Sequence, residues 1–214
     1  MRFLNDPEEI YERSFEIIAS EVDLSALPAD VRRIVLRIIH ACGMTDIVDD
    51  LRIDPGLYET VRAALMDGKP VLVDTRMTRT GIIRRFLPED ARLLCKIGDE
   101  ETLRVSRQLG VTRAAAAVSR WRPHLEGAIC IIGNAPTALF TLLEMIDNGA
   151  PAPAAIIAFP VGFVGAVESK VELDADPRGA RIATLLGRRG GAAMAAAAFN
   201  AMISMAREAG EWTS

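Results

Sequence analysis

The sequence predicts an α/β fold in which a mostly parallel sheet carries helices on both faces and follows an N-terminal helical segment. Three observations support this prediction. The first third of the chain repeats apolar residues at helical spacing. Short apolar runs bounded by Gly, Pro or Asp then alternate with helical stretches, which is typical of a parallel sheet. The later runs are apolar throughout, as expected for central strands buried on both faces.

Three helices are expected in the N-terminal third. Residues 7–21 follow Asp6, a residue type that caps helix N-termini. Residues 28–42 place their apolar side chains on one helical stripe, and Gly43 ends that pattern. A third helix is expected over residues 55–66, because a proline opens it and an Asp-Gly pair follows it.

Expected strands and helices alternate along the rest of the chain. Strands are expected at 71–73, 93–95, 128–132 and 155–159. Helices are expected near 77–86, 100–109, 111–121, 136–147 and 163–173, with an Ala-rich final helix over 191–206. No repeat or linker divides the sequence, so a single domain over 1–214 is expected.

Composition narrows the class of partner. A net charge of −4 and 5% aromatic residues are unlike nucleic-acid-binding proteins, which are normally basic and often stack bases on aromatic rings. The basic residues are 22 Arg and 3 Lys. A guanidinium group binds carboxylate in a bidentate way, so this bias suits a ligand with many carboxylates. A GC-rich coding sequence would produce the same bias.

Cysteine usage and hydropathy favour a cytoplasmic protein. Cys42, Cys95 and Cys130 lie far apart, without the spacing of a zinc site or of a disulfide framework, so buried thiols in a reducing compartment are expected. The N-terminus is polar and acidic, unlike a signal peptide. The long uncharged stretches contain Gly, Pro or Asn, so no membrane span is predicted.

Two expected strand–loop–helix junctions are candidates for ligand binding. Residues 133–139 follow the strand at 128–132, and Pro136 suits the first helical position. Free backbone N–H groups and the helix dipole at such a junction attract anions, although an ordinary turn has the same sequence. Residues 159–170 form a second junction, in which the polar segment 168–170 is expected to be a solvated helix face.

His40 is a candidate acid–base group. It lies off the apolar stripe of its helix, on an adjacent face with Arg33 and Arg37. A plain surface histidine fits the same pattern.

The glycine-rich segment 187–191 does not indicate a nucleotide site. It lacks the Lys-Ser/Thr ending of a phosphate loop, and no GxGxxG follows the first expected strand. An arginine beside flexible glycines could instead clamp a carboxylate.

Five segments follow one another in a characteristic order. They are Tyr11-Glu12-Arg13-Ser14-Phe15, His40-Ala41-Cys42-Gly43, Gly133-Asn134-Ala135-Pro136-Thr137-Ala138-Leu139, Pro160-Val161-Gly162-Phe163-Val164 with Glu168-Ser169-Lys170, and Gly187-Arg188 with Gly190-Gly191. Together they resemble the precorrin-8X methylmutase family of cobalamin biosynthesis, over residues 11 to about 205.

The resemblance implies an isomerase with a Rossmann-like α/β fold. Members of this family move a methyl group from position eleven to position twelve on ring C of a tetrapyrrole, and precorrin-8X becomes hydrogenobyrinate. No external cofactor and no metal take part. The resemblance also implies a homodimer with the substrate cleft near the subunit interface. Transient contact with neighbouring enzymes of the corrin pathway is a further expectation.

The resemblance implies roles for particular residues as well. His40 corresponds to the proton donor or acceptor, and Ser14 corresponds to a substrate-binding position. Further contacts to the ring and its carboxylates are expected from Arg13, Asn134, Arg113 and Arg188. Two departures from the family pattern weaken other contacts. Ala192 stands where relatives often have serine, and the segment 74–81 keeps Asp74, Met77 and Gly81 but differs between them. Arg76 and Arg79 of that segment could still reach carboxylates of the ligand.

Three alternatives also fit the sequence. The same cleft could serve a tetrapyrrole-binding or channelling protein that holds hydrogenobyrinate for the next enzyme. The substrate could be the cobalt-containing precorrin-8. A nucleotide-dependent Rossmann enzyme is the third alternative, but its glycine-rich turn is absent.

Overall fold

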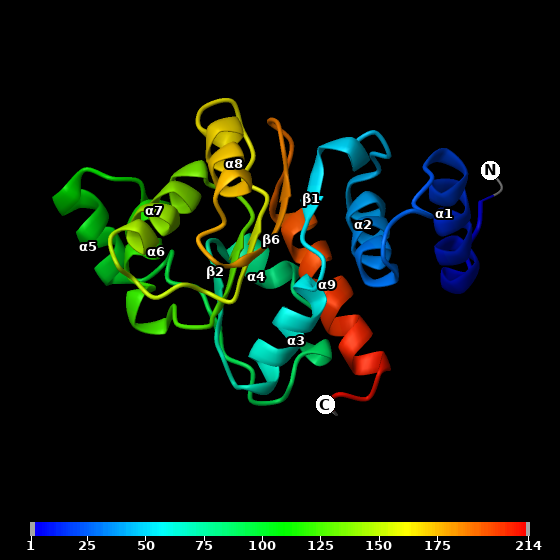
Figure 1. Ribbon diagram of the computed structural model, residues 1–214, viewed down its shortest axis with the longest axis horizontal. Coiled ribbons are helices and arrows are strands. Elements are labelled where there is room, and N and C mark those ends of the chain that lie inside the picture. Colours follow the sequence, from blue (N-terminus) through cyan, green and yellow to red (C-terminus); the bar gives the residue numbers. More distant parts are fainter. Residues whose placement is uncertain (1–2, 213–214) are drawn as a thin grey trace.

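The computed structural model describes residues 3–212 as a layered α/β structure (Figure 1). The helices are α1 (Pro7–Glu21), α2 (Ala29–Cys42), α3 (Leu57–Met66), α4 (Arg76–Gly81), α5 (Glu100–Leu109), α6 (Arg113–Ser119), α7 (Pro136–Asp147), α8 (Ala166–Ala175) and α9 (Ala192–Glu208), with short 3-10 turns η1 (Val48–Asp50), η2 (Arg84–Phe86) and η3 (Arg122–His124). The strands are β1 (Leu51–Ile53), β2 (Val71–Val73), β3 (Leu93–Leu94), β4 (Ile129–Ile132), β5 (Ala155–Ala158) and β6 (Arg181–Leu185).

The strands form one sheet of six in the order β1-β6-β5-β4-β2-β3. Every pair is parallel except β1 with β6. The predicted fold class is therefore confirmed, with a mostly parallel sheet and an N-terminal helical segment. The sequence does not predict β1 or β6, because Arg52 lies at the centre of β1 and β6 begins at the exposed Arg181.

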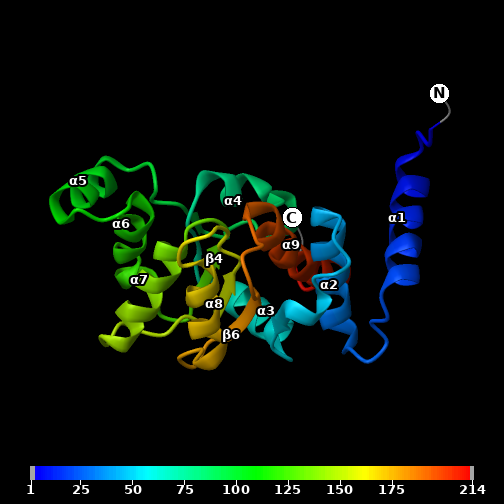
Figure 2. The same cartoon turned by 90° about the horizontal axis from the view of Figure 1, so that it is seen from above.

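Alternate strand residues face two different cores. In β4, Ile129 and Ile131 join the core beneath α2, α3 and α9, whereas Cys130 and Ile132 join the core beneath α6 and α7. This period of two is the pattern of strands buried on both faces. Helices accordingly cover both faces of the sheet, as expected (Figures 1 and 2).

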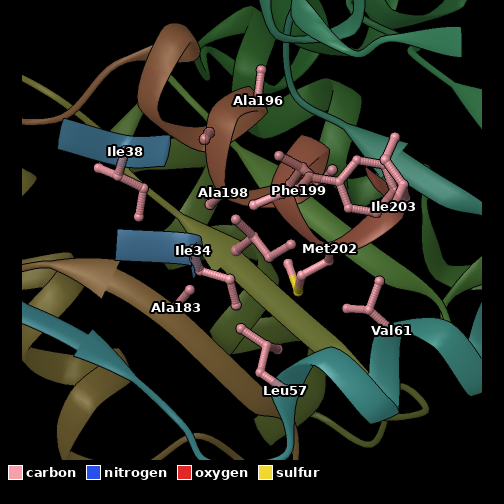
Figure 3. Close-up of a cluster of buried hydrophobic side chains, with 14 of the residues drawn as sticks. Ile34, Ile38, Leu57, Val61, Ala183, Ala196, Ala198, Phe199, Met202 and Ile203 are labelled. Atoms are coloured by element: carbon pink, nitrogen blue, oxygen red, sulfur yellow. The ribbon is translucent and has the colours of Figure 1, made fainter. Parts of the chain in front are cut away.

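The Ala-rich helix α9 lies at the centre of one core. Phe199, Met202 and Ile203 on α9 are buried against Ile34 and Ile38 of α2 and against side chains of α3 (Figure 3). The small alanines between them let neighbouring elements approach closely. One of those approaches is Gly81, where a Cβ atom would lie 2.8 Å from the Cβ of Ala196.

Tertiary hydrogen bonds shorten the helix expected near 77–86. α4 ends at Gly81, whose carbonyl accepts a hydrogen bond from Asn200 Nδ2 at 2.8 Å. The backbone N–H of Ile83 donates to Asn200 Oδ1 at 2.9 Å. Because α9 supplies these partners, the chain leaves the helix after six residues.

Helix α1 stands apart from the rest of the protein and packs against α2 (Figure 2). Its N-terminus is capped as predicted, since Asp6 accepts hydrogen bonds from the backbone N–H groups of Glu8 and Glu9. Within α1, which is described completely, Ile18 is the one buried side chain. Ile10 and Ile17 are more than 40% exposed, so an apolar strip of α1 faces outward.

None of the helices within residues 3–212 is both long and apolar enough to span a bilayer. Of the three thiols, Cys130 is fully buried and burial strongly raises its pKa, as expected for a structural cysteine. Cys42 and Cys95 are half-buried, which corrects the expectation that all three are buried.

Candidate active site

Ser14 and His40 line one cavity of about 310 Å³ between α1 and α2. Ser14 lies on α1, and its hydroxyl donates to the carbonyl of Ile10 at 2.7 Å. His40 lies in the last turn of α2. The two residues implied as proton carrier and substrate contact are thus on neighbouring helices with a shared opening. We call this space the His40 cavity.

The imidazole of His40 is held by aromatic packing. Its ring stacks on Phe15 with centroids 5.3 Å apart and planes inclined by 11°, and Tyr11 approaches at 5.8 Å. Among the described residues, His40 makes no hydrogen bond through its ring nitrogens. The side chain is exposed, so both nitrogens are available to a ligand.

The arginines near His40 have other partners. Arg33 pairs with Glu208 at 2.7 Å, and the guanidinium of Arg37 lies 5.2 Å from the ring centroid of Tyr11. The candidate Arg13 pairs with Glu16 at 2.8 Å on the exposed side of α1. An exposed ion pair of this kind is weak, so a ligand carboxylate can replace Glu16 at small cost.

Sequence reasoning missed two polar residues of the His40 cavity. Thr45 and Glu21 both line it, and the Thr45 hydroxyl donates to Glu21 Oε2 at 2.9 Å. Glu21 is the last residue of α1, and Thr45 follows the end of α2. No sequence motif connects them, because their contact depends on how α1 packs on α2.

A second group of candidates lies where strands β4, β5 and β6 end. We call residues 133–135, 159–165 and 186–191 the strand-tip loops. The carbonyl of Asn134 accepts from the backbone N–H of Val161 at 3.1 Å, and the carbonyl of Arg188 accepts from Gly162 at 3.1 Å. The structure therefore brings Asn134 and Arg188 to adjoining loops.

Arg188 and Arg113 are both exposed at this edge of the sheet. The Arg188 guanidinium lies 5.3 Å from the ring centroid of Phe163, a side chain that is 83% exposed. Arg113 begins α6 directly after Thr112, whose hydroxyl lies 2.8 Å from that of Thr137 on α7. Neither guanidinium has a hydrogen-bond partner in the part of the chain that the structure describes, so both forks are free to meet carboxylates.

The anion site expected from the free N–H groups of residues 133–135 is already occupied by a side chain. Asp74, fully buried at the end of β2, accepts from the N–H groups of Gly133, Asn134 and Ala135 at 3.1, 2.9 and 3.4 Å. The Thr78 hydroxyl donates to the same carboxylate at 2.9 Å. Burial raises the pKa of Asp74, while these hydrogen bonds oppose the rise. The loop is thus fixed by an internal carboxylate and does not offer its amides to a ligand.

In the segment 168–170, Glu168 is exposed as expected for a solvated face, but the next two residues are not, which corrects the expectation for them. Ser169 and Lys170 are fully buried, and Lys170 Nζ donates to the carbonyl of Arg189 at 2.7 Å. Burial lowers the pKa of Lys170 to about 8, with Asp50 acting in the opposite direction. Lys170 therefore fixes one strand-tip loop by a hydrogen bond to the backbone of that loop.

The two groups of candidates remain separate in this chain. The His40 cavity is not lined by Asn134, Arg113 or Arg188. The two groups of candidates are linked through Arg189 of the strand-tip loops, which pairs with Asp46 at 2.7 Å in the segment following α2. The structure thus joins Ser14 with His40, and Asn134 with Arg188, without joining the two pairs.

Fold and site together define an open α/β protein whose polar side chains gather where parallel strands end, which is the class whose ligands bind beyond those ends. The precorrin-8X methylmutase family model matches residues 9–205. The chain belongs to the precorrin-8X methylmutase family, whose members are isomerases of cobalamin biosynthesis.

Similar proteins agree with this assignment. The chain is 51% identical to the precorrin-8X methylmutase of Pseudomonas aeruginosa over 200 residues, which is 94% of this chain and 96% of that protein. It is 35% identical to the cobalt-precorrin-8 methylmutase of Salmonella typhimurium, over 98% of this chain and all of that one. The solved precorrin-8X methylmutase of Thermus thermophilus superimposes with a TM-score of 0.83 at 33% identity, covering 97% of this chain and 100% of that one.

Proposed function

We propose that this chain, acting as one domain over residues 1–214, converts precorrin-8X to hydrogenobyrinate by moving a methyl group from C11 to C12 of ring C. The shared cavity of Ser14 and His40 carries this proposal. It places an unpaired imidazole beside a hydroxyl on an exposed face that a large ring can reach. The reaction is an isomerisation, so no atom is gained or lost and no external cofactor is required.

His40 acts as the proton donor or acceptor. The methyl migration redistributes charge around the conjugated ring, and protonation at the ring lowers that barrier. The same imidazole recovers the proton when the product forms, which keeps the reaction balanced. A positioned acid of this kind contributes about 10²–10⁴ in rate.

The substrate is held through its acetate and propionate side chains. Arg188, Arg113 and Asn134 offer polar contacts at the strand-tip loops and the start of α6, while Arg13 and Ser14 offer them on α1. Rigid holding of the ring selects one migration over competing proton shifts.

The proposed substrate lacks cobalt. The chain is 51% identical to a relative named for precorrin-8X and 35% identical to one named for cobalt-precorrin-8. The alternative substrate is cobalt-precorrin-8, and parallel assays with both compounds would decide between them.

A homodimer in the cytoplasm is the proposed assembly, with transient contacts to neighbouring enzymes of the corrin pathway. The outward strip of α1, with Ile10, Tyr11 and Ile17 at least 40% exposed, supports a second copy covering it. Such a partner would close the open side of the His40 cavity. Sedimentation of the purified chain would show a dimer.

The test of the catalytic role is His40→Ala. We expect turnover of precorrin-8X to fall by about 10²–10⁴ while corrinoid binding stays within about tenfold, because the carboxylate contacts remain. The change from the yellow precursor to the orange corrin follows the reaction. His124→Ala, which alters the other histidine of the chain, is the matched control and should be as active as the wild type. Turnover retained in His40→Ala would contradict the assignment.

A second candidate function is a corrinoid carrier that holds hydrogenobyrinate for the next enzyme. Free arginines near the strand-tip loops favour tight binding of a polyanionic product. Slow product release together with turnover would show that the chain does both. Tight product binding without turnover in the wild type would leave only the carrier.

A further inference from the structure

A second cavity lies at the carboxyl ends of β2 and β3, apart from the His40 cavity. Its volume is about 580 Å³, and α4, η2 and the segment following β3 surround it. Its lining includes Arg76, Arg79, Thr80, Arg84, Cys95 and Asp99. Helix α9 lies between α4 and the helix α2 that carries His40 (Figures 1 and 2). We call this space the arginine cavity.

The three arginines of this cavity have no counter-ion of their own. Arg76, Arg79 and Arg84 make no ion pair and donate no side-chain hydrogen bond within residues 3–212. The cavity's one acidic residue, Asp99, is neutralised by Arg120 at 2.8 Å, and Arg120 also donates to Thr102 at 2.7 Å. The cavity therefore carries an uncompensated positive charge.

Two observations show that the guanidinium groups of Arg76 and Arg79 converge on this space, which Arg84 also lines. Burial raises the pKa of the Cys95 thiol, and the charges of Arg79 and Arg76 oppose that rise, so both act on the cavity wall. The Arg76 guanidinium also lies where a Cβ atom of Gly98 would be. The absence of a side chain at residue 98 is what allows this arrangement.

The helix that carries two of the arginines is fixed to the sheet. Thr75 caps α4 by accepting the N–H of Thr78 at 3.1 Å. The Thr78 hydroxyl donates to Asp74, the carboxylate that also holds residues 133–135. Arg76 and Arg79 are therefore presented from the same rigid edge of the sheet as the strand-tip loops.

We propose that the arginine cavity is a binding subsite for carboxylate groups of a polyanionic ligand. Three guanidinium groups in one cavity suit a ligand with several carboxylates better than a ligand with a single carboxylate. Each guanidinium group can bind one carboxylate in a bidentate pair. The identity of the natural ligand rests on the proposed function, under which the subsite receives side chains of precorrin-8X. Inorganic phosphate shares the anionic chemistry and is the competing ligand to be tested.

The first test is calorimetric titration of the full chain at low ionic strength with tricarballylate, which has three carboxylates, and separately with inorganic phosphate. We expect tricarballylate to bind in the millimolar range or tighter, and phosphate to bind more weakly. In Arg79→Gln/Arg84→Gln, tricarballylate affinity should fall at least about tenfold. No binding by the wild type, or equal binding of phosphate, would overturn the assignment.

Two further variants separate the cavity from general surface charge. Arg107→Gln removes an exposed α5 arginine outside the cavity and should leave tricarballylate affinity within about twofold, because screening weakens distant charges. Gly98→Ala keeps every charge but displaces the Arg76 guanidinium, so affinity should fall severalfold. An equal loss in Arg107→Gln, or full affinity in the double variant, would contradict the proposal.

The assay with precorrin-8X distinguishes this proposal from the proposed function. We expect the double variant to raise KM at least about tenfold with kcat nearly unchanged, since the cavity lies away from His40. His40→Ala should lose turnover yet bind tricarballylate normally. If the wild type binds anions through Arg79 and Arg84 but does not turn over precorrin-8X, the proposed function is wrong and the anion subsite is supported. If the wild type turns over precorrin-8X and the double variant has an unchanged KM, the subsite is wrong and the proposed function is supported.

Discussion

The strand-tip loops and the His40 cavity are built from opposite kinds of contact. Buried polar groups fix the loops: Asp74 accepts three backbone N–H groups, and Lys170 donates to the carbonyl of Arg189. Aromatic packing between two helices positions His40, and α1 buries a single side chain within its length. The strand-tip loops are therefore part of the folded core, whereas the His40 cavity lies at a helix attached to its surface.

This difference predicts which variants lose stability and which lose activity. Changes beneath the strand-tip loops should lower the free energy of unfolding, because they leave buried polar groups unpaired. Changes in the His40 cavity should lower activity with little loss of stability.

Asp74→Asn should be the most damaging of these changes. The asparagine amide keeps the size of the side chain but turns an NH₂ group toward backbone N–H donors that the carboxylate accepted. The free energy of unfolding should fall by about 3 kcal/mol, measured by urea denaturation. Asp67→Asn, an exposed aspartate at the end of α3, is the control and should change stability by less than about 0.5 kcal/mol. Equal stability of the two variants would contradict the structural role of Asp74.

Gly190→Ala tests the close packing of two strand-tip loops. A Cβ atom at residue 190 would overlap the carbonyl oxygens of Phe159 and Pro160, which are backbone atoms that cannot rotate away. We expect the free energy of unfolding to fall by about 2 kcal/mol. Gly98→Ala is the matched control, because its Cβ meets only the movable end of Arg76 and should cost far less. A smaller loss at residue 190 than at residue 98 would show that these loops are loose.

Lys170→Met tests the burial of this lysine through the pH dependence of stability. Burial lowers the pKa of Lys170 from 10.5 to about 8, so between these values the folded protein holds this proton less tightly than the unfolded chain. The contribution of Lys170 to the wild-type free energy of unfolding should therefore increase as the pH rises from 8 to 10.5, by an amount on the order of 2 kcal/mol.

The variant should lack that rise, since methionine does not titrate. Thermal melts of both proteins at pH 7.5 and at pH 10 would measure the difference. Parallel slopes in the two proteins would mean that Lys170 is solvated.

Phe15→Leu should have the smallest effect on stability and a clear effect on activity. It removes the ring that stacks on His40 at 5.3 Å but keeps an apolar side chain on α1. We expect stability to change by less than about 1 kcal/mol and kcat to fall roughly tenfold, because the imidazole loses its fixed orientation. Steady-state kinetics and a thermal melt test both halves of this prediction. An unchanged kcat would show that Phe15 does not orient His40. A large drop in the melting temperature would show that α1 is part of the core.

Local sequence signals determined most of the fold. Apolar spacing located the N-terminal helices, and uninterrupted apolar runs located β2, β3, β4 and β5, because burial on two faces leaves no polar positions. The same signals failed at β1, an edge strand with Arg52 at its centre, and at β6, an inner strand that begins at the exposed Arg181. They also failed at the end of α4, since Asn200 on a distant helix supplies the hydrogen bonds that stop it.

For the candidate site, ordered motifs were enough to select Ser14, His40 and the strand-tip loops and to indicate the family. Their partners were decided by tertiary structure alone. No local pattern shows that Asp74 reaches residues 133–135, that Lys170 is buried rather than solvated, or that three arginines meet in one cavity. The physical reason is that pairing of polar groups depends on which segments the sheet order brings together, and spacing along the chain carries no record of that order.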